Sequence, residues 1–394
     1  MLFTCALIAV FWVSVAVRVG RSRSEDRWRL GPDSPCLPAL PRLTVLIPAR
    51  NEAANIGPCL DSVFASDHGN LEVVVFDDSS TDGTAELARS RRAKVVAGSG
   101  DVPAGWKGKP WALHRAWLWL ERHPVKSEWL LFLDADVRLH PSALSRAHSR
   151  AITDGVALLS GFGKLEMVTF WEKVIQPSVG GLILAGNDLD KVNDPARQDA
   201  VIANGQFILV RADAYRAVGG HQAVAADILD DVGLARAFVA RQFPILVLFM
   251  RELFSCRMYT SLRELWLGWT KNLYAGMRYS VALPVALSTF IAFEFVFPYF
   301  LPGIALARED WVGLVAAIGV LTLIHSVRYW MDGIFGQERA FGLLQGLGAA
   351  MLVGMLLDSV RRARTGNVLW KGRKYAVTPE DETSVVRGVD RTET

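Results

Sequence analysis

The sequence predicts a doubly wound, Rossmann-like α/β domain joined to transmembrane helices. Hydrophobic residues make up 51% of the 394 residues, a share at the upper edge for soluble domains. The excess is concentrated in residues 2–17 and 281–357. Between these ranges, short β-rich apolar runs alternate with helical stretches, which is the pattern of a parallel sheet covered by helices.

The first apolar run predicts a membrane anchor at residues 1–18. No positive charge precedes its apolar core and it has no small-x-small cleavage site, so we expect it to be retained. Arginines follow it directly, which is typical of a cytoplasmic flank and places the N-terminus outside. They are Arg18, Arg21, Arg23, Arg27 and Arg29. Because they explain the basic charge, a net charge of +3 does not indicate nucleic-acid binding.

Residues 19–42 are basic and then proline-rich, which predicts a linker to a domain at residues 43–258. Four apolar runs in that domain suit strands buried on both faces, and the stretches between them are long enough for crossover helices. The strands are LTVLIP at 43–48, LEVVVF at 71–76, AKVVAG at 93–98 and WLLFLD at 129–134, with helices near 53–65, 82–92, 109–122 and 141–152. Ligands bind at the carboxyl ends of such strands, so the residues there are the first candidates for a site.

Asp134 and Asp136 follow the fourth run. Two carboxylates one residue apart can both face Mg²⁺ or Mn²⁺, which prefer oxygen ligands and often share them with substrate phosphates. A solvated loop is the alternative for a lone D-x-D, but the position after WLLFL favours a metal site.

Asp77 and Asp78 end the second run, where carboxylates can accept hydrogen bonds from a uracil-like base or from ribose hydroxyls. The alternative is that polar residues at 80–84 cap the following helix. Both can hold, and we expect capping by residues 80–84 and nucleotide contact by Asp77 and Asp78.

Gly108 opens the third helix with Lys107 and Lys109 alongside. A lysine at a helix N-terminus can bind a diphosphate, so we assign this role to Lys109. A basic surface turn is the alternative.

Asp230 and Asp231 lie at the start of an otherwise apolar helix. Adjacent helical positions point about 100° apart, so only one of the two can face a reaction centre. In a cleft, that one can serve as a general base for an acceptor hydroxyl. Simple helix capping is the alternative.

In order along the chain, these motifs resemble those of family 2 glycosyltransferases, which have the GT-A fold and invert anomeric configuration. The motifs are LTVLIPARNE, VVFDDSSTDGT, GKPWAL, FLDAD, NGQFILVRADAYRAVGG and the acidic pair. The similarity covers about residues 40–280. With its anchor and apolar C-terminal third, the chain is similar to hopene-associated (hopanoid) and carotenoid-associated membrane glycosyltransferases.

The resemblance implies a role for each matching residue. Asp77 and Asp78 match the nucleoside-binding acids, and Asp134 and Asp136 match the metal-binding D-x-D. Asp231, with Asp230 beside it, matches the catalytic base. Glu52, in the opening motif with Pro48 and Arg50, matches a position near the nucleotide.

Two departures from the family pattern stand out. The first acid of the usual E-D pair is Asp230, which has a shorter side chain. Where many members have Q-x-x-R-W, this chain has LWLGW at 265–269, so the arginine that contacts the diphosphate is missing. We expect Lys271 to substitute for it and Trp269 to stack on the acceptor. A processive polysaccharide synthase is disfavoured for the same reason.

The C-terminal third predicts an amphipathic interfacial helix at 259–280, transmembrane helices within 281–360 and a cytoplasmic basic tail at 361–394. The apolar stretches are at 281–307, 311–327 and 340–358. With an external N-terminus, one anchor and three full spans would put the basic tail outside, against the charge rule. One segment is therefore re-entrant or interfacial, or the count is wrong.

Together these features predict an inverting, metal-dependent hexosyltransferase of the inner cell membrane, with its catalytic domain cytoplasmic. The expected partners are a nucleotide sugar, UDP-linked in our prediction, a lipid or isoprenoid hydroxyl acceptor, and the bilayer. The alternatives are a polyprenyl-phosphate sugar synthase and a non-catalytic nucleotide-binding scaffold. A transporter is disfavoured, because the apolar segments are too few.

Overall fold

A computed structural model describes residues 1–21, 24–98, 101–122, 127–277, 279–365, 368–370 and 373–375. Parts of four predicted segments therefore lie outside the described residues: 22–23 of the linker, 99–100 and 123–126 of the domain at 43–258, Arg278 of the interfacial helix, and much of the basic tail. The chain forms two compact units. One contains residues 24–166 and 187–258, and the other contains 1–23, 167–186 and 259–394.

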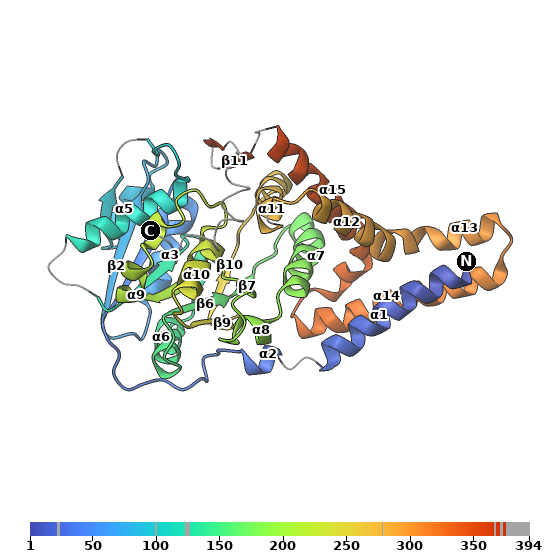
Figure 1. Ribbon diagram of the computed structural model, residues 1–394, viewed down its shortest axis with the longest axis horizontal. Helices are drawn as coiled ribbons and strands as arrows, with labels where there is room; N and C mark the ends of the chain where they lie inside the picture. Colours follow the sequence, from blue (N-terminus) through green and yellow to red (C-terminus); the bar gives the residue numbers. More distant parts are fainter. Residues whose placement is uncertain are drawn as a thin grey trace, which may run out of the picture. The chain divides into compact units, whose positions relative to one another are not determined.

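The first unit is built on a seven-stranded sheet (Figure 1). The strand order is β3-β2-β1-β4-β8-β6-β9, from β1 (Leu43–Ala49), β2 (Leu71–Asp77), β3 (Lys94–Ala97), β4 (Trp129–Leu133), β6 (Leu158–Phe162), β8 (Phe207–Arg211) and β9 (Ile245–Phe249). The four predicted strands are confirmed and are mutually parallel. The complete sheet is mixed, because β8, which was not among the predicted strands, runs antiparallel to β4 and β6. The segment before β8 lies at the carboxyl end of β4, where Asp134 N–H donates to Gln206 O, so β8 must run back along β4.

Alternation along the strands divides the core between the two faces of the sheet. Val45 and Ile47 pack on the face covered by α3 (Ala53–Phe64), α4 (Thr84–Ser90) and α6 (Ala143–Thr153). Leu46, between them, packs on the face covered by α5 (Gly108–Glu121), α9 (Ala212–Ala217) and α10 (Asp230–Ala240). The four predicted crossover helices are thus α3 to α6. The three-layer arrangement aims the loops after β1, β2 and β4 at one edge of the sheet.

Smaller elements complete this unit. A second sheet has the order β5-β10-β7, from β5 (Val137–Leu139), β7 (Lys164–Leu165) and β10 (Phe254–Cys256). The short helices are α2 (Ser24–Arg27), α8 (Leu189–Val192) and the 3₁₀ turn η1 (Gly220–Gln222).

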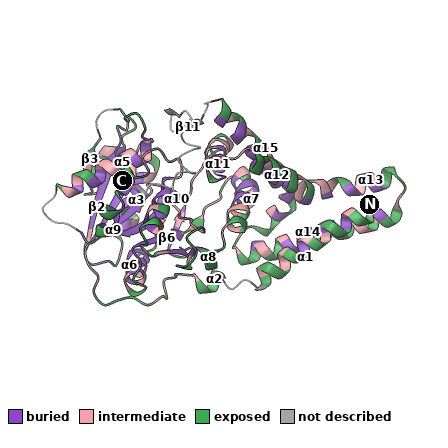
Figure 2. Ribbon diagram, viewed as in Figure 1, coloured by how far each residue is buried: buried purple, intermediate pink, exposed green. Residues whose placement is uncertain are grey.

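The second unit is helical apart from the hairpin of β11 (Val368–Trp370) and β12 (Arg373–Tyr375). Its helices are α1 (Leu2–Arg21), α7 (Phe170–Gly186), α11 (Leu262–Gly276), α12 (Ala282–Ile291), η2 (Ala292–Val296), η3 (Phe297–Phe300), α13 (Leu301–Ala307), α14 (Trp311–Ile334), η4 (Arg339–Leu344) and α15 (Gln345–Arg364). Among the described residues, four helical segments are long and apolar enough to cross a membrane: 2–20, 282–307, 311–334 and 339–364. Figure 2 shows exposed residues along α1 and α14, and these include Val10, Val315 and Ile318. Exposed apolar side chains of this kind suit contact with lipid.

The segment 282–307 is not a regular α-helix throughout. A π-turn at η2 and a 3₁₀ turn at η3 precede α13, where Pro298 has no N–H to donate to the carbonyl of Glu294. That carbonyl instead accepts from the Trp12 indole N–H, at 3.3 Å. A neighbouring helix thus satisfies the backbone group that proline leaves free, as a membrane interior requires.

Candidate active site

The loops after β1 and β2 are tied together by hydrogen bonds. Asn51, in the left-handed region at φ 53°, donates its N–H to Ser80 Oγ at 3.0 Å and accepts from Thr81 N–H at 2.9 Å. Asparagine tolerates this conformation better than most residues. Glu52 N–H donates to Thr84 Oγ1 at 2.8 Å. The two loops therefore form a single ledge at the edge of the sheet.

Asp77 and Asp78 lie on this ledge and are both buried. Arg50 Nη1 lies 2.7 Å from Asp78 O and 3.4 Å from Asp78 Oδ2. Asp77 Oδ2 accepts from Ser80 N–H at 3.3 Å, whereas its Oδ1 is buried with no hydrogen-bond partner among the described residues. A buried acceptor without a donor is costly, and a base or ribose could supply the missing donor.

Capping within residues 80–84 is confirmed, and Asp82 performs it. Its Oδ1 accepts from Thr84 N–H, at the start of α4, and its Oδ2 accepts from Ala53 N–H, at the start of α3. One carboxylate thus satisfies backbone donors of two helices.

Lys109 connects three motifs that are distant in sequence. Its Nζ lies 2.6 Å from Asp134 Oδ1 and 3.3 Å from Gly205 O. Burial by itself would lower the pKa of Lys109. The nearby carboxylates of Asp134, Asp230 and Asp231 have the larger combined effect, so the pKa of Lys109 is raised above its ordinary value. The lysine is therefore a fixed positive charge among the predicted metal ligands and the predicted base.

Asp136 lies deeper than Asp134. Burial, and then the charges of Asp134 and Glu52, raise its pKa to about 7, although the Cys256 thiol donates a hydrogen bond to it. Its Oδ1 is buried and has no hydrogen-bond partner among the described residues. The Cys256 thiol therefore supports this carboxylate.

The residues present fit a divalent cation. No cluster of three or more His, Cys, Asp or Glu side chains suited to a metal occurs in the described part of the chain. The protein would thus supply the two carboxylates of Asp134 and Asp136 and leave the other positions to phosphate oxygens and water, as is common for Mg²⁺. Asp136 Oδ1, which has no hydrogen-bond partner among the described residues, is the atom that such a cation would stabilise most.

Asp230 and Asp231 point to different neighbours, as their helical spacing predicts. Asp231 Oδ2 accepts from Gly205 N–H at 2.8 Å and Oδ1 accepts from Val232 N–H at 2.9 Å, while burial raises its pKa. Asp230 Oδ2 lies 3.9 Å from Nε2 of buried His221. Burial lowers the pKa of His221 to about 3, so this ring is neutral near pH 7.

Sequence reasoning assigned no role to the segment around Gly205. A Cβ atom added to Gly205 would lie 3.1 Å from Lys109 Nζ and 3.2 Å from Asp231 Oδ2, so a side chain here would displace one of these two groups. Asn204 Nδ2 donates to Gly161 O and to Gln206 Oε1, which holds this turn in place. The glycine in NGQF was the signal available, but its neighbours are distant in sequence.

Comparison with known proteins identifies the domain that carries these residues. Residues 44–218 match the family "Glycosyl transferase family 2". Residues 44–218 form a family 2 glycosyltransferase domain. Its mixed sheet with helices on both faces is the GT-A fold, as the resemblance implied.

Relatives and solved structures extend the similarity over more of the chain. A 4,4′-diaponeurosporenoate glycosyltransferase of Staphylococcus aureus is 26% identical over 346 residues, covering 86% of this chain and 89% of that protein. A mannosyltransferase from Pyrobaculum calidifontis, solved with GDP-Man and Mn²⁺, is 17% identical with a TM-score of 0.48, covering 90% of this chain and 99% of that one. A glucosyl-3-phosphoglycerate synthase from Mycobacterium tuberculosis, solved with Mn²⁺, UDP and glucosyl-3-phosphoglycerate, is 20% identical with a TM-score of 0.38, covering 60% of this chain and 80% of that one.

Two predicted site residues, Trp269 and Lys271, lie outside the residues that match the family, on α11 in the helical unit. The Trp269 ring packs 5.9 Å from that of Tyr259, and its buried indole N–H has no hydrogen-bond partner in the described part of the chain. Their contact with acceptor and diphosphate stays a prediction. Pro48 lies within β1, where its backbone is part of the strand that leads to Arg50 and Glu52.

Proposed function

We propose that this protein is an inverting, metal-dependent hexosyltransferase that moves a sugar from a nucleotide sugar to a lipid. The observation that carries the proposal is the position of Lys109, which lies 2.6 Å from Asp134 and bonds to Gly205, the residue that also binds Asp231. Groups suited to bind a diphosphate, a cation and an acceptor proton are thus gathered around one side chain.

The donor side of the site is assigned to the ledge after β1 and β2. Asp77 Oδ1 needs a hydrogen-bond donor, and a uracil imide or a ribose hydroxyl offers one. Arg50 holds Asp78 in place, and Glu52 adds negative charge near Asp136. We assign a UDP-linked sugar on this basis, with Lys109 beside its diphosphate.

Asp134 and Asp136 would hold Mg²⁺ or Mn²⁺, and such a cation would neutralise the charge that develops on the leaving diphosphate. The chain supplies the remaining chemistry. Asp231 takes the proton of the acceptor hydroxyl, the acceptor oxygen bonds to the anomeric carbon, and the bond from that carbon to the phosphate oxygen breaks. The nucleoside diphosphate leaves with both electrons of that bond. One displacement inverts the anomeric carbon, and the raised pKa of Asp231 suits a general base.

The acceptor is proposed to be a lipid or isoprenoid-type hydroxyl at the cytoplasmic face of the inner membrane. The described residues include four helical segments long and apolar enough to cross a membrane, which supports a membrane-bound substrate. The Staphylococcus aureus relative is named for 4,4′-diaponeurosporenoate, and this name supports a polyene or isoprenoid-like acceptor. Because the ending "-oate" denotes a carboxylate, a lipid carboxylate is a second candidate, and such an acceptor has no proton for Asp231 to remove.

The test uses the purified full-length protein with a panel of radiolabelled nucleotide sugars and total membrane lipids, with and without EDTA. We expect a labelled lipid from one donor, and its loss with EDTA. Lipid alcohols, lipid carboxylates and polyprenyl phosphates tested separately distinguish the three acceptor classes. Nucleotide binding without hydrolysis or transfer from any donor would instead identify a non-catalytic scaffold.

A further inference from the structure

Two of the four apolar helical segments run in the same direction side by side. A Cβ atom placed on Gly313, near the start of α14, would lie 3.0 Å from Met1 Cγ. One placed on Gly20, at the end of α1, would lie 3.4 Å from the ring of Trp330, near the end of α14. Helices α1 and α14 therefore begin at one common face and end at the opposite one (Figure 1).

The segment 282–307 runs in the opposite direction. The chain turns between Ala307 and Trp311, where Asp310 Oδ1 caps α14 by accepting from Gly313 N–H at 2.8 Å. Further along, the Tyr299 hydroxyl lies 3.4 Å from His325 Nε2. The start of α12 is thus on the face where α1 and α14 end.

The end of α15 lies toward that same face, and its start lies beside the second half of α14 and the ring of Tyr299. At its start, Gln345 accepts a hydrogen bond from Arg328, in the last two turns of α14. At its end, Val360 and Ala363 pack against Tyr274, just ahead of α12. A helix that crossed the bilayer after α14 would have to end beside the opposite ends of α1 and α14, and α15 does not.

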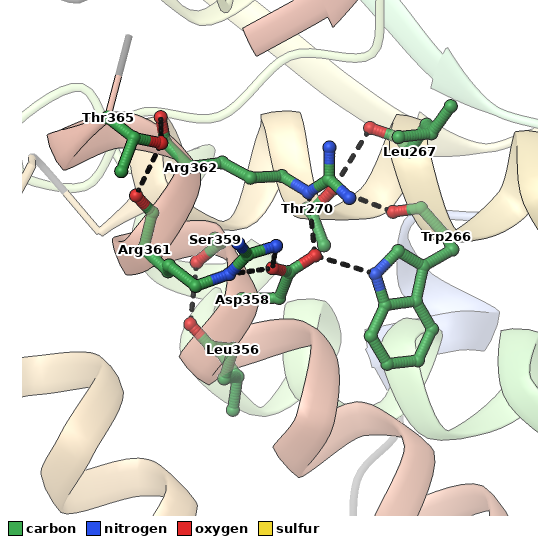
Figure 3. Close-up of polar contacts among 9 residues, drawn as sticks. All are labelled: Trp266, Leu267, Thr270, Leu356, Asp358, Ser359, Arg361, Arg362 and Thr365. Atoms are coloured by element: carbon green, nitrogen blue, oxygen red, sulfur yellow. Dashed lines mark hydrogen bonds and ion pairs between the residues drawn. The ribbon is translucent and has the colours of Figure 1, made fainter. Parts of the chain in front are cut away.

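Helix α15 packs against α7 and α11, and charged side chains lie at these contacts. Gly348 of α15 lies against the backbone of α7, and Gly354 of α15 lies against the Trp266 ring of α11. Trp266 Nε1 donates to Asp358 Oδ2 at 2.8 Å, and the same carboxylate binds Arg361 and Arg362, each at 2.6 Å (Figure 3). On α7, Lys173 pairs with Glu338 at 2.6 Å. Charged side chains in lipid are costly, so helices bearing these pairs belong at the membrane surface.

We propose that α15 does not cross the bilayer, although its composition allows it to. Three segments cross, namely α1, 282–307 and α14, and α15 lies with α7 and α11 at the face that carries the glycosyltransferase domain. This face is defined by the chain itself, because the domain follows directly after α1 and leads directly into α11. The basic end of α15 then lies on the same side as Arg18, which satisfies the positive-inside rule and removes the conflict found in the sequence.

The test measures which side of the membrane single cysteines face. Of the four cysteines, Cys36 is exposed and belongs to the catalytic unit, whereas Cys5, Cys59 and Cys256 are buried. Cys36 therefore reports the catalytic face. Two reporters are added separately to a Cys36→Ser background: Arg308→Cys, in the turn between 282–307 and α14, and Thr365→Cys, directly after α15.

Full-length protein in sealed vesicles of each orientation is treated with a membrane-impermeant maleimide, and labelling is expressed relative to detergent-opened vesicles. We expect Thr365→Cys to react in the vesicles in which Cys36 reacts, and Arg308→Cys to react in the other orientation. Arg364→Cys provides a second reporter and should agree with Thr365→Cys. The proposal would be overturned if Thr365→Cys and Arg364→Cys reacted in the same vesicles as Arg308→Cys. It would also be overturned if neither of them reacted in the vesicles in which Cys36 reacts. Neither outcome bears on sugar transfer, so the result is independent of the proposed activity.

Discussion

Lys109 Nζ lies 2.6 Å from Asp134 Oδ1, and the two residues come from the start of a helix and the end of a strand. The same ammonium contacts the carbonyl of Gly205, whose N–H binds Asp231. One positive charge therefore links the predicted metal ligand to the predicted base.

Replacing Lys109 with alanine should reduce transfer by a factor of at least about 100, because fixed charges aimed at developing charge contribute on that scale. It should also lower the free energy of unfolding by about 2 kcal/mol, since Asp134 would lose a charged hydrogen-bond partner. Transfer assays and thermal unfolding in detergent measure the two effects. Lys94→Ala, which removes the ion pair with Glu72 in the same domain, is the control and should retain transfer. Equal activity of the two variants would exclude Lys109 from the site.

Asp136→Asn and Asp231→Asn should each abolish transfer to a hydroxyl acceptor while the protein stays folded in detergent. The loss should be at least about 100-fold for Asp231, the usual contribution of a general base. Asp199→Asn, which alters an exposed ion pair with Arg197, is the control. Turnover by Asp231→Asn that remains near normal with a lipid carboxylate, but not with a lipid alcohol, would favour the carboxylate as acceptor. Near-normal turnover with both acceptors would refute the role of Asp231.

Removal of divalent cations should stop transfer, and added Mn²⁺ or Mg²⁺ should restore it. Because Asp136 Oδ1 is buried with no hydrogen-bond partner in the part of the chain that the structure describes, Asp136→Asn should also weaken Mn²⁺ binding itself. Loss of the free Mn²⁺ signal in electron paramagnetic resonance measures that binding without any need for activity. Unchanged Mn²⁺ binding in Asp136→Asn and Asp134→Asn would place the cation elsewhere.

Gly205→Ala should lower transfer with little loss of folded protein. The added methyl would lie 3.1 Å from Lys109 Nζ and 3.2 Å from Asp231 Oδ2, so one of these groups must move. A Cβ atom on Gly69 meets nothing within 4 Å, which makes Gly69→Ala a matched control in the same domain. If both alanine variants transfer sugar at the rate of the parent protein, the contact between Gly205 and Asp231 has no part in catalysis.

The catalytic unit should lose stability in acid through a buried histidine pair. His148 Nδ1 lies 3.0 Å from His68 Nε2, and burial lowers the pKa of His148 to about 3. In the unfolded chain this ring has a pKa near 6.5, so the unfolded state binds more protons between these values. The stability is complete above about pH 6.5 and falls by up to about 1.4 kcal/mol per pH unit as pH drops toward 3.

Thermal unfolding midpoints at pH 7.5, 6 and 5 measure this loss. His148→Phe should show a shallower fall than the parent protein, whereas exposed His140→Asn should follow the parent protein. An equally steep fall in His148→Phe would assign the acid sensitivity to other groups.

The predicted fold depended on local pattern, which is why much of it could be derived from residues alone. The runs at 43–48 and 71–76 are apolar except at Thr44 and Glu72, a pattern that favours strands buried on both faces. Strands β6, β8 and β9 were not predicted, and the direction of β8 depends on the turn at Asn204 to Gln206. The acids at the ends of β1, β2 and β4 were predictable because strand direction alone places them at one edge.

The sequence by itself determined the catalytic domain type, the acids of the candidate site and the four apolar segments, because each of these follows from residues that are neighbours along the chain. Only the tertiary structure decided that Lys109 pairs with Asp134, that Gly205 bonds to Asp231 and that the end of α15 lies beside Tyr274, just ahead of α12. These relationships join residues distant in sequence. Packing brings such residues together, and no local periodicity encodes the pairing.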